Sequence, residues 1–270
     1  MTILTLKTQP RASLEAEIIA PDNILGKTEP EIASLKAMHG NEPVVLGDFF
    51  AVKAGGSDLL ILNGDLCRVK NIAAGMTRGR VEINGHAGMH LGARMQGGEI
   101  HVSGNTGDWA GAEMTGGKIC ICGNAGHGLG GAYRGSRWGM NRGLIIVEGN
   151  AGNEAGAGMR RGLIVVKGNT GDFAGAFMIA GTIVVFGKLG SRAGAGLVRG
   201  TIITFQPAEL LPTFRYDCRY RPEFLSVIWR DLRASGVSIG EDAGTGCFER
   251  YSGDFNRLGK GEILIHDQRE

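Results

Sequence analysis

The chain has 270 residues, of which 43% are hydrophobic and 47 are glycine, and its formal net charge is +2 at pH 7. This balance argues against a nucleic-acid partner, and no stretch approaches the roughly 20 apolar residues of a membrane span. The five cysteines are scattered and odd in number, and residues 1–7 lack the apolar region of a secretory signal. We therefore expect a cytoplasmic protein that contacts neither nucleic acid nor membrane.

Residues 1–56 precede any regular pattern and are predicted to form an N-terminal cap. Thr28-Glu29-Pro30-Glu31 has the form of a capping box and should begin a short helix that ends near Ala37. The segments 44–46 and 49–52 are apolar and are predicted to be strands. A cap is expected because the open end of a stack of strands exposes unpaired backbone groups.

Residues 57–205 repeat on a fixed period. A glycine returns every 19 residues, with one interval of 26. These glycines are Gly79, Gly98, Gly117, Gly143, Gly162, Gly181 and Gly200. A unit this short cannot bury a core by itself, so each unit must stack on its neighbours as a solenoid.

Each unit opens with a strand pattern, in which β-branched residues such as Ile100 and Val102 alternate onto one face. Equivalent strands stacked once per turn form parallel ladders about 4.8 Å apart. The sequence therefore predicts an all-β fold, a right-handed parallel β-helix of about seven to eight 19-residue turns.

Two further columns follow the glycine period. Asparagines after most strands are expected to stack at the corners, where they tolerate positive φ and pair backbone groups. Methionines that close most units are expected to fill the interior rather than to bind copper. The two columns are Asn105, Asn124, Asn150 and Asn169, and Met76, Met95, Met114, Met140, Met159, Met178 and Leu197.

Residues 206–270 are predicted to form a C-terminal extension with one helix over residues 222–235. Proline stands near the start of this helix and glycine at its end. An apolar stripe runs along one side of the helix. The stripe consists of Phe224, Leu225, Ile228, Trp229 and Leu232.

No Ser-His-Asp arrangement, Walker loop or paired zinc spacing stands out, so no catalytic, cofactor-binding or metal residue is assigned. His101, Cys120 and Cys122 fall on one outer face and could hold a metal. A second cysteine pair is missing, and small cysteines are common on tightly packed β surfaces. His86 and His90 straddle a corner that we expect to be solvated.

The outward-facing side chains change character half-way along the stack, from Glu82, His101 and Cys120 to a run of apolar residues. A sheet that is apolar on both faces must be covered. The predicted helix could fold back over about three turns, but we favour an interface between subunits. The predicted interface residues are Leu144, Ile146, Leu163, Val165, Val184, Phe186, Ile203 and Phe205.

The 26-residue interval contains an insertion near residues 131–137, just before Trp138. An exposed loop with aromatic and arginine side chains on a rigid scaffold suits a protein contact. We therefore add Tyr133, Arg134, Arg137 and Trp138 to the predicted interface. A tolerated surface insertion is the alternative.

The repeat Gly-x-Ile-x-Val-x-Gly-Asn-x-Gly-x-x-x-Gly-Ala-x-Met is similar to the β-helical domain at the C-terminus of glutamate synthase, over about residues 57–205. The whole chain, including Tyr-Asp-Cys-Arg-Tyr-Arg-Pro-Glu-Phe-Leu at residues 216–225, more specifically resembles the C subunit of formylmethanofuran dehydrogenase. The resemblance is greatest to the bacterial version in the formyltransferase/hydrolase complex of methylotrophs.

This resemblance implies a scaffold subunit in one-carbon metabolism and formaldehyde oxidation. In such a complex a formyl group passes from formyl-tetrahydromethanopterin to a methanofuran-type carrier and is released as formate. The implied partners are a formyltransferase subunit, an amidohydrolase-like subunit and a further member of the complex, possibly with a second copy of this chain. The family's catalytic residues, carrier and metals are expected in those partners, so none is carried over to this chain.

Three alternatives stay open. The chain could belong to a tungsten or molybdenum formylmethanofuran dehydrogenase. It could be an independent β-helix enzyme, such as a polysaccharide lyase or an acyltransferase, although 19 is not a multiple of the six-residue acyltransferase period. It could also line a passage for the carrier through a basic edge. The arginines of that edge would be Arg142, Arg160, Arg161 and Arg199.

Overall fold

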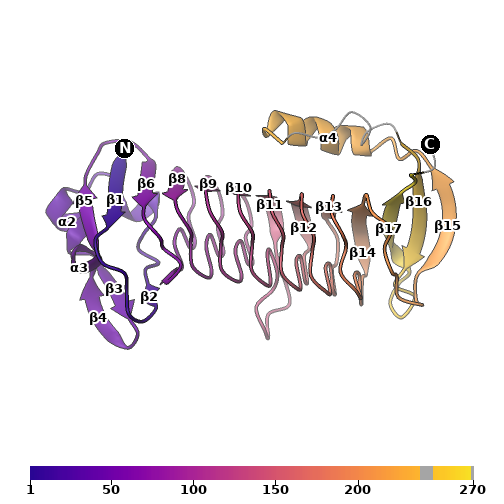
Figure 1. Cartoon of the computed structure of the whole chain (residues 1–270), viewed down its shortest axis with the longest axis horizontal. Coiled ribbons are helices and arrows are strands. Elements are labelled where there is room, and N and C mark those ends of the chain that lie inside the picture. The colour runs from indigo at the N-terminus through magenta and orange to yellow at the C-terminus, as the bar shows by residue number, and fades with distance from the viewer. Residues whose placement is uncertain (238–245, 269–270) are drawn as a thin grey trace.

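The computed structural model describes residues 1–237 and 246–268 and shows a long stack of strands with a small cap at its N-terminal end (Figure 1). The first strands and helices are β1 (Thr2–Leu6), β2 (Leu14–Glu15), α1 (Pro21–Ile24), α2 (Glu29–Ala33), β3 (Lys36–His39), β4 (Glu42–Val45), α3 (Leu46–Phe49) and β5 (Phe50–Lys53). The stack comprises β6 (Leu59–Asn63), β7 (Val69–Lys70), β8 (Arg80–Asn84), β9 (Glu99–Val102), β10 (Lys118–Ile121), β11 (Asn141–Val147), β12 (Arg161–Val166), β13 (Thr182–Val185) and β14 (Arg199–Thr204). The last elements are β15 (Arg215–Tyr220), α4 (Leu225–Ala234), β16 (Phe248–Gly253) and β17 (Lys260–His266).

One 13-stranded sheet runs the length of the molecule in the order β15-β16-β17-β14-β13-β12-β11-β10-β9-β8-β6-β1-β5. Strands β8 to β14 pair in parallel in sequence order. The predicted register is confirmed, because Ile100 pairs with Val81 on one side and with Ile119 on the other. The prediction of a mostly-β chain built on stacked parallel strands is therefore confirmed.

The sheet continues across both boundaries that the sequence suggested, residues 56 and 205. Strand β1 from the cap pairs in parallel with β6. At the other end β17 pairs in parallel with β14, and Ile263 stands opposite Ile202. The antiparallel strands β16 and β15 then follow, so both terminal segments close the ends of one sheet.

The interior of the stack is filled by the inward strand residues and by the predicted methionine column. All seven members of that column, from Met76 to Leu197, are buried. The inward strand residues Ile100, Val102, Ile164 and Val166 are buried in the same cluster. The expectation that the methionines form core is confirmed.

The corners of the stack are joined by two ladders of side chains that accept hydrogen bonds from the next turn. In the predicted ladder the backbone N–H of Asn124 donates to Oδ1 of Asn105, at 2.8 Å, and later turns repeat this contact. His86 begins this ladder, since its Nδ1 accepts from the backbone N–H of Asn105. A second ladder, not predicted, runs through Asp108, His127, Asn153 and Asp172.

The cap contains the predicted helix in shortened form. The capping box at Thr28 is present, and the backbone N–H of Thr28 donates to Oε2 of Glu31 at 2.7 Å. The helix ends at Ala33 rather than near Ala37, because residues from Lys36 onward form strand β3 and pair with β2 and β4. The predicted strands at 44–46 and 49–52 appear as β4 and β5, with helix α3 between them.

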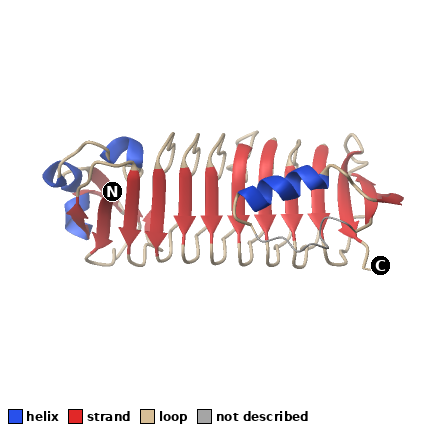
Figure 2. Ribbon diagram, turned by 90° about the horizontal axis from the view of Figure 1, so that it is seen from above, coloured by secondary structure: helices blue, strands red, loops and turns tan. Residues whose placement is uncertain are grey.

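Helix α4 occupies residues within the predicted range 222–235 and lies across the second half of the sheet (Figure 2). Leu225, Trp229 and Leu232 pack onto the outward side chains of β11 to β14. The outward residues that the helix buries are Ile146, Val165, Val184 and Ile203. This finding corrects the favoured expectation of a second subunit over these four, since the chain's own helix covers them.

The other four predicted interface residues on this face lie at the margin of the helix. Leu144, Leu163, Phe186 and Phe205 are half-buried and pack against the cluster under α4. Phe186 and Phe205 stack with their ring centroids 4.7 Å apart, and both contact Trp229. A partner contact through these four residues stays a prediction.

Replacing Gly116 with alanine is expected to destabilise the stack by more than about 2 kcal/mol. A Cβ at Gly116 would collide with the backbone of Gln96 in the preceding turn. Gly56 is the matched control, because nothing lies within 4 Å of the position of its added Cβ. Urea unfolding followed by circular dichroism measures both variants, and equal midpoints for the two would contradict the expectation.

Trp229→Ala is expected to lower the free energy of unfolding by about 3–5 kcal/mol, because it leaves a cavity between α4 and the sheet. Val227 lies on the same helix but is 49% exposed, so Val227→Ala should change stability by less than about 0.5 kcal/mol. The same unfolding measurement distinguishes the two. Similar small decreases in the free energy of unfolding for both variants would mean that packing of α4 on the sheet does not stabilise the fold.

Candidate functional site

The side of the stack opposite α4 carries a face that we call the corner face. Its side chains stand at two positions in successive turns, four residues apart, where the backbone is left-handed. The non-glycine residues at these positions are Asn71, His90, Arg94, Trp109, Glu113, Glu154, Phe173, Phe177 and Arg192. None of these side chains is buried.

The left-handed conformation is unfavourable for residues with a Cβ by roughly 1–2 kcal/mol. Other turns place glycine at the equivalent corners, as at Gly128 and Gly196. The stack would therefore tolerate glycine throughout, yet it places polar and aromatic side chains on this face. Strain of this kind is concentrated at functional sites, which makes the corner face the candidate site.

The insertion loop, residues 131–138, crosses the corner face. Its ends are tied to the following turns, since the N–H of Ala132 donates to the oxygen of Ala157 and the N–H of Gly139 to that of Gly158, both at 2.9 Å. Between these anchors the loop directs Tyr133 back toward the cap. The predicted interface residues Arg134, Arg137 and Trp138 are exposed on the same loop.

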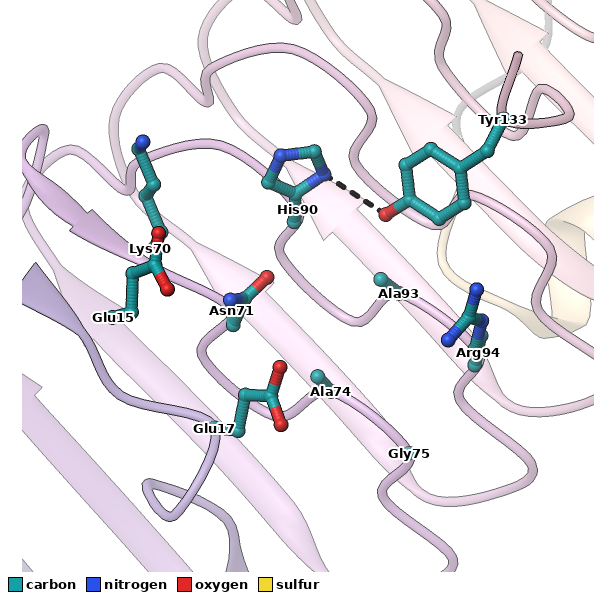
Figure 3. A pocket seen from close by; sticks show the side chains of 10 residues that line it. All are labelled: Glu15, Glu17, Lys70, Asn71, Ala74, Gly75, His90, Ala93, Arg94 and Tyr133. Carbon is teal, nitrogen blue, oxygen red and sulfur yellow. Dashed lines mark hydrogen bonds between the residues drawn. The ribbon is translucent and has the colours of Figure 1, made fainter. Parts of the chain in front are cut away.

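Tyr133 contacts residues from the two preceding turns. Its hydroxyl lies 2.9 Å from Nδ1 of His90 (Figure 3). The guanidinium of Arg94 lies over its ring, 5.6 Å from the centroid, and Arg94 is ion-paired with Glu113 at 3.0 Å. The ring of Trp109 stacks on His90 with centroids 5.7 Å apart.

A cleft of about 400 Å³ opens between this cluster and the N-terminal cap (Figure 3). Glu15 and Glu17 line it from the cap, and Lys70 and Asn71 line it from the first turn of the stack. Its wall at Gly75 is open, since nothing lies within 4 Å of an added Cβ there. The cleft therefore presents carboxylate, ammonium, amide, imidazole and phenol groups to a polar ligand.

Partial burial sets the protonation of the two central groups. Burial lowers the pKa of His90, and the positive charge of Lys70 lowers it further. Burial also raises the pKa of Tyr133 to about 12. At neutral pH the pair is therefore a neutral imidazole and a protonated phenol, which can bind a ligand through hydrogen bonds without adding charge.

A second cleft, of about 490 Å³, lies on the other side of the insertion loop. The loop residues Tyr133 and Arg137 line one wall, and Phe173 and Phe177 line the other. Trp138 stands beside it with two guanidinium groups over its ring, those of Arg137 at 4.9 Å and Arg160 at 4.6 Å. The insertion loop thus separates a polar cleft from an aromatic one.

The candidate metal residues are brought together only in part. Sγ of Cys122 lies 3.6 Å from Nε2 of His101, as adjacent strands allow. Cys120 instead packs against the cluster under α4, and burial raises the pKa of its thiol. Within the described residues no group of three or more His, Cys, Asp or Glu side chains could hold a metal ion.

The sequence predicted the insertion but not the residues that it contacts. The expectation that His90 lies at a solvated corner is wrong, since the residue is half-buried and bonded to Tyr133. Glu15 and Glu17 were also missed, because the cap has no repeat that would place them, and Lys70 was missed because it lies in the first turn of the stack, before the regular glycine period begins at Gly79. The second corner ladder could have been found, as Asp108 and His127 are 19 residues apart.

The chain matches the family model described as the GXGXG motif over residues 61–214, more than half of its length. The chain belongs to this family. The matched residues include the corners of the stack, where left-handed glycines such as Gly128 and Gly130 alternate with other residues.

Two groups of named relatives match this chain. It is 43% identical over 96 residues to the C subunit of tungsten-containing formylmethanofuran dehydrogenase 2 from Methanothermobacter thermautotrophicus, covering 34% of this chain and 36% of the relative. It is 37% identical over 94 residues to the C subunit of molybdenum-containing formylmethanofuran dehydrogenase 1 from Methanosarcina barkeri, covering 33% and 31%. These matches thus span about a third of the curated relatives, and they show homology to the C subunit of formylmethanofuran dehydrogenase.

The fold also matches a solved structure along its whole length. That structure is a chain of the formyltransferase/hydrolase complex (FhcABCD) of Methylorubrum extorquens in complex with methylofuran. The TM-score is 0.93 at 34% sequence identity, and the match covers 98% of this chain and 100% of the other. The cap and the C-terminal extension are therefore shared as well as the stack.

No helix in the described part of the chain has the length and apolar character needed to cross a bilayer.

The stability of the protein is expected to fall as pH drops below about 6.5, and His90 should account for part of that loss. Because burial lowers the pKa of His90, the unfolded chain takes up a proton there before the folded chain does. In His90→Gln this contribution is removed. Urea unfolding at several pH values should show the difference between wild type and variant shrinking on acidification, whereas parallel pH profiles would contradict the assignment.

Proposed function

We propose that this chain is a scaffold subunit of a formyltransferase/hydrolase complex. That complex would move a formyl group from formyl-tetrahydromethanopterin to a methanofuran-type carrier and release it as formate. The formyltransferase and amidohydrolase-like partners would hold the carrier and the metals. One observation carries the proposal, the full-length match to a chain of FhcABCD with a TM-score of 0.93.

The way in which the chain uses its ionisable corner residues supports a scaffold role. Nδ1 of His86 and Nδ1 of His127 accept hydrogen bonds from the backbone of the next turn. Oδ1 of Asp108 does the same. An enzyme could use such groups for acid–base chemistry, but here they accept hydrogen bonds that join one turn to the next.

The path of the chain between residues 57 and 205 supports the proposed architecture, a right-handed parallel β-helix. A second set of parallel bridges joins the turns away from the main sheet, at Ala87, Thr106, Ala125, Ala151 and Thr170. Two ladders per turn hold the stack against bending, which suits a protein that spaces other subunits. Such a protein would work in the cytoplasm, where free cysteines such as Cys67, Cys122 and Cys218 would stay reduced.

A second candidate is a subunit of a tungsten or molybdenum formylmethanofuran dehydrogenase. The identity of 43% to the C subunit of a tungsten-containing enzyme favours it, but over only 96 residues. The match to FhcABCD extends through the cap and the extension at both ends. Since the likeness to that chain includes both terminal segments as well as the repeats, we place the hydrolase setting first.

Affinity purification of the tagged chain from its own cell tests the proposal. We expect it to co-purify with equimolar formyltransferase and amidohydrolase-like subunits, in an assembly that converts the formyl carrier to formate. Native mass spectrometry gives the composition, and formate release gives the activity. Co-purification with tungsten- or molybdenum-containing subunits would favour the second candidate, and a lone chain would contradict both.

A further inference from the structure

Exposed aromatic rings on the corner face and on the neighbouring turn between β16 and β17 are paired with arginine. Beyond the Arg137 and Arg160 contacts with Trp138, the guanidinium of Arg192 lies 5.4 Å from the ring centroid of Phe173. That of Arg257 lies 6.0 Å from Phe177. That of Arg215 lies 5.4 Å from Phe255. We call Trp138, Phe173, Phe177 and Phe255, with the arginines over them, the arginine–aromatic patch.

The patch is continuous from the insertion loop to the turn between β16 and β17. The aromatic cleft joins Arg137 to Phe173 and Phe177. The backbone N–H of Gly196 donates to Oδ2 of Asp254, at 2.9 Å, which ties the β16–β17 turn to the last corners of the stack. In Figure 1 both the loop below β11 and this turn project from the edge away from α4.

The arginines of the patch form no close ion pair within the described chain, although Arg257 interacts electrostatically with the carboxylate of Asp254. Arg137, Arg160, Arg192, Arg215 and Arg257 form no ion pair with any described carboxylate. Glu154 lines the aromatic cleft as the one acidic residue among its lining residues. The whole chain has a net charge of only +2, so this concentration of arginine is a local feature.

The rings of the patch are exposed to an extent that folding does not require. Phe177 is 61% exposed and Phe255 52%, and Trp138 is 37% exposed. Phe173 and Phe177 also hold left-handed backbone, at φ of 62° and 54°. Aromatic and arginine side chains dominate the energetic centres of protein–protein interfaces. A strained, exposed set of them points to binding rather than to packing.

We propose that the arginine–aromatic patch docks an acidic surface of a partner protein, whose carboxylates pair with the five arginines while an apolar side chain enters the cleft beside Phe177. The inference rests on the proposed function, because it names the face through which a member of the complex would meet its neighbour. A second copy that docks through the same patch does not fit, since the two sets of arginines would repel each other. Nucleic acid fits less well, because guanidinium groups already occupy the ring faces on which bases would stack.

Site-specific photo-crosslinking in the assembled complex identifies the occupant. Phe177→p-benzoylphenylalanine places the probe in the patch. Val227→p-benzoylphenylalanine is the matched control, because Val227 is similarly exposed but lies on α4 at the opposite edge. We expect the Phe177 probe to crosslink to a co-purified protein in a peptide rich in Asp and Glu. Crosslinks to a second copy, to RNA or from the Val227 probe alone would overturn the proposal.

Charge reversal measures the electrostatic part of the contact. The double variant Arg160→Glu/Arg257→Glu should weaken assembly at least about tenfold and reduce its dependence on salt. Arg230→Glu is the control, since Arg230 is exposed on α4. Circular dichroism checks that each variant is folded. Equal assembly of the double variant and the control would overturn the proposal.

The two proposals can fail separately. If the wild-type chain assembles with the formyltransferase and amidohydrolase-like subunits but the double variant does so equally well, the patch inference is wrong and the proposed function stands. If the wild-type chain does not assemble with them, the proposed function itself is wrong.

Discussion

The close stacking of each turn on the next is the constraint on which the rest of the structure depends. At Gly116 the backbone of one turn lies so near that of the preceding turn that no side chain fits between them. Hydrogen bonds from backbone to corner side chains, such as Asn124 to Asn105, then hold the turns in register. With the turns fixed at this spacing, every side chain is repeated in a column, and the columns determine the interior and both outer faces.

The two opposite sides of the stack differ in what covers them. On one side α4 covers the apolar second half of the sheet, and Trp229 is buried there with Val184 and Ile203. On the opposite side the corner face is exposed, and it carries polar, aromatic and arginine side chains on unfavourable backbone. An apolar sheet can be satisfied by the chain's own helix. The exposed rings of Phe177 and Phe255 have no such cover within the described residues.

A covered side and an exposed side together suit a scaffold protein. A scaffold must be stiff between its ends and must offer surfaces that other proteins can recognise. The paired ladders of the stack provide the stiffness. The insertion loop makes one part of the otherwise repetitive corner face different in shape from the rest. Because the loop separates a polar cleft from an aromatic one, neighbouring parts of the same face can serve different partners or ligands.

The sequence by itself determined the period, the register and the buried columns. In a stack, positions 19 residues apart are neighbours. Their spacing in the sequence therefore predicts that Ile100 pairs with Ile119, and that Met95 and Met114 are buried in one column. The same spacing showed that the outer sheet turns apolar at Ile146. The 26-residue interval marked the insertion for the same reason, as a break in the period.

Only the tertiary structure decided what covers that sheet and where the insertion points. Whether a helix folds back over Val165 or leaves it to a partner depends on the path of a connection that has no repeat. The contact of Tyr133 with His90, and of Arg257 with Phe177, likewise joins residues whose separation is unrelated to the period. Such contacts depend on how non-repeating segments fold back on the stack, and no spacing in the sequence encodes that path.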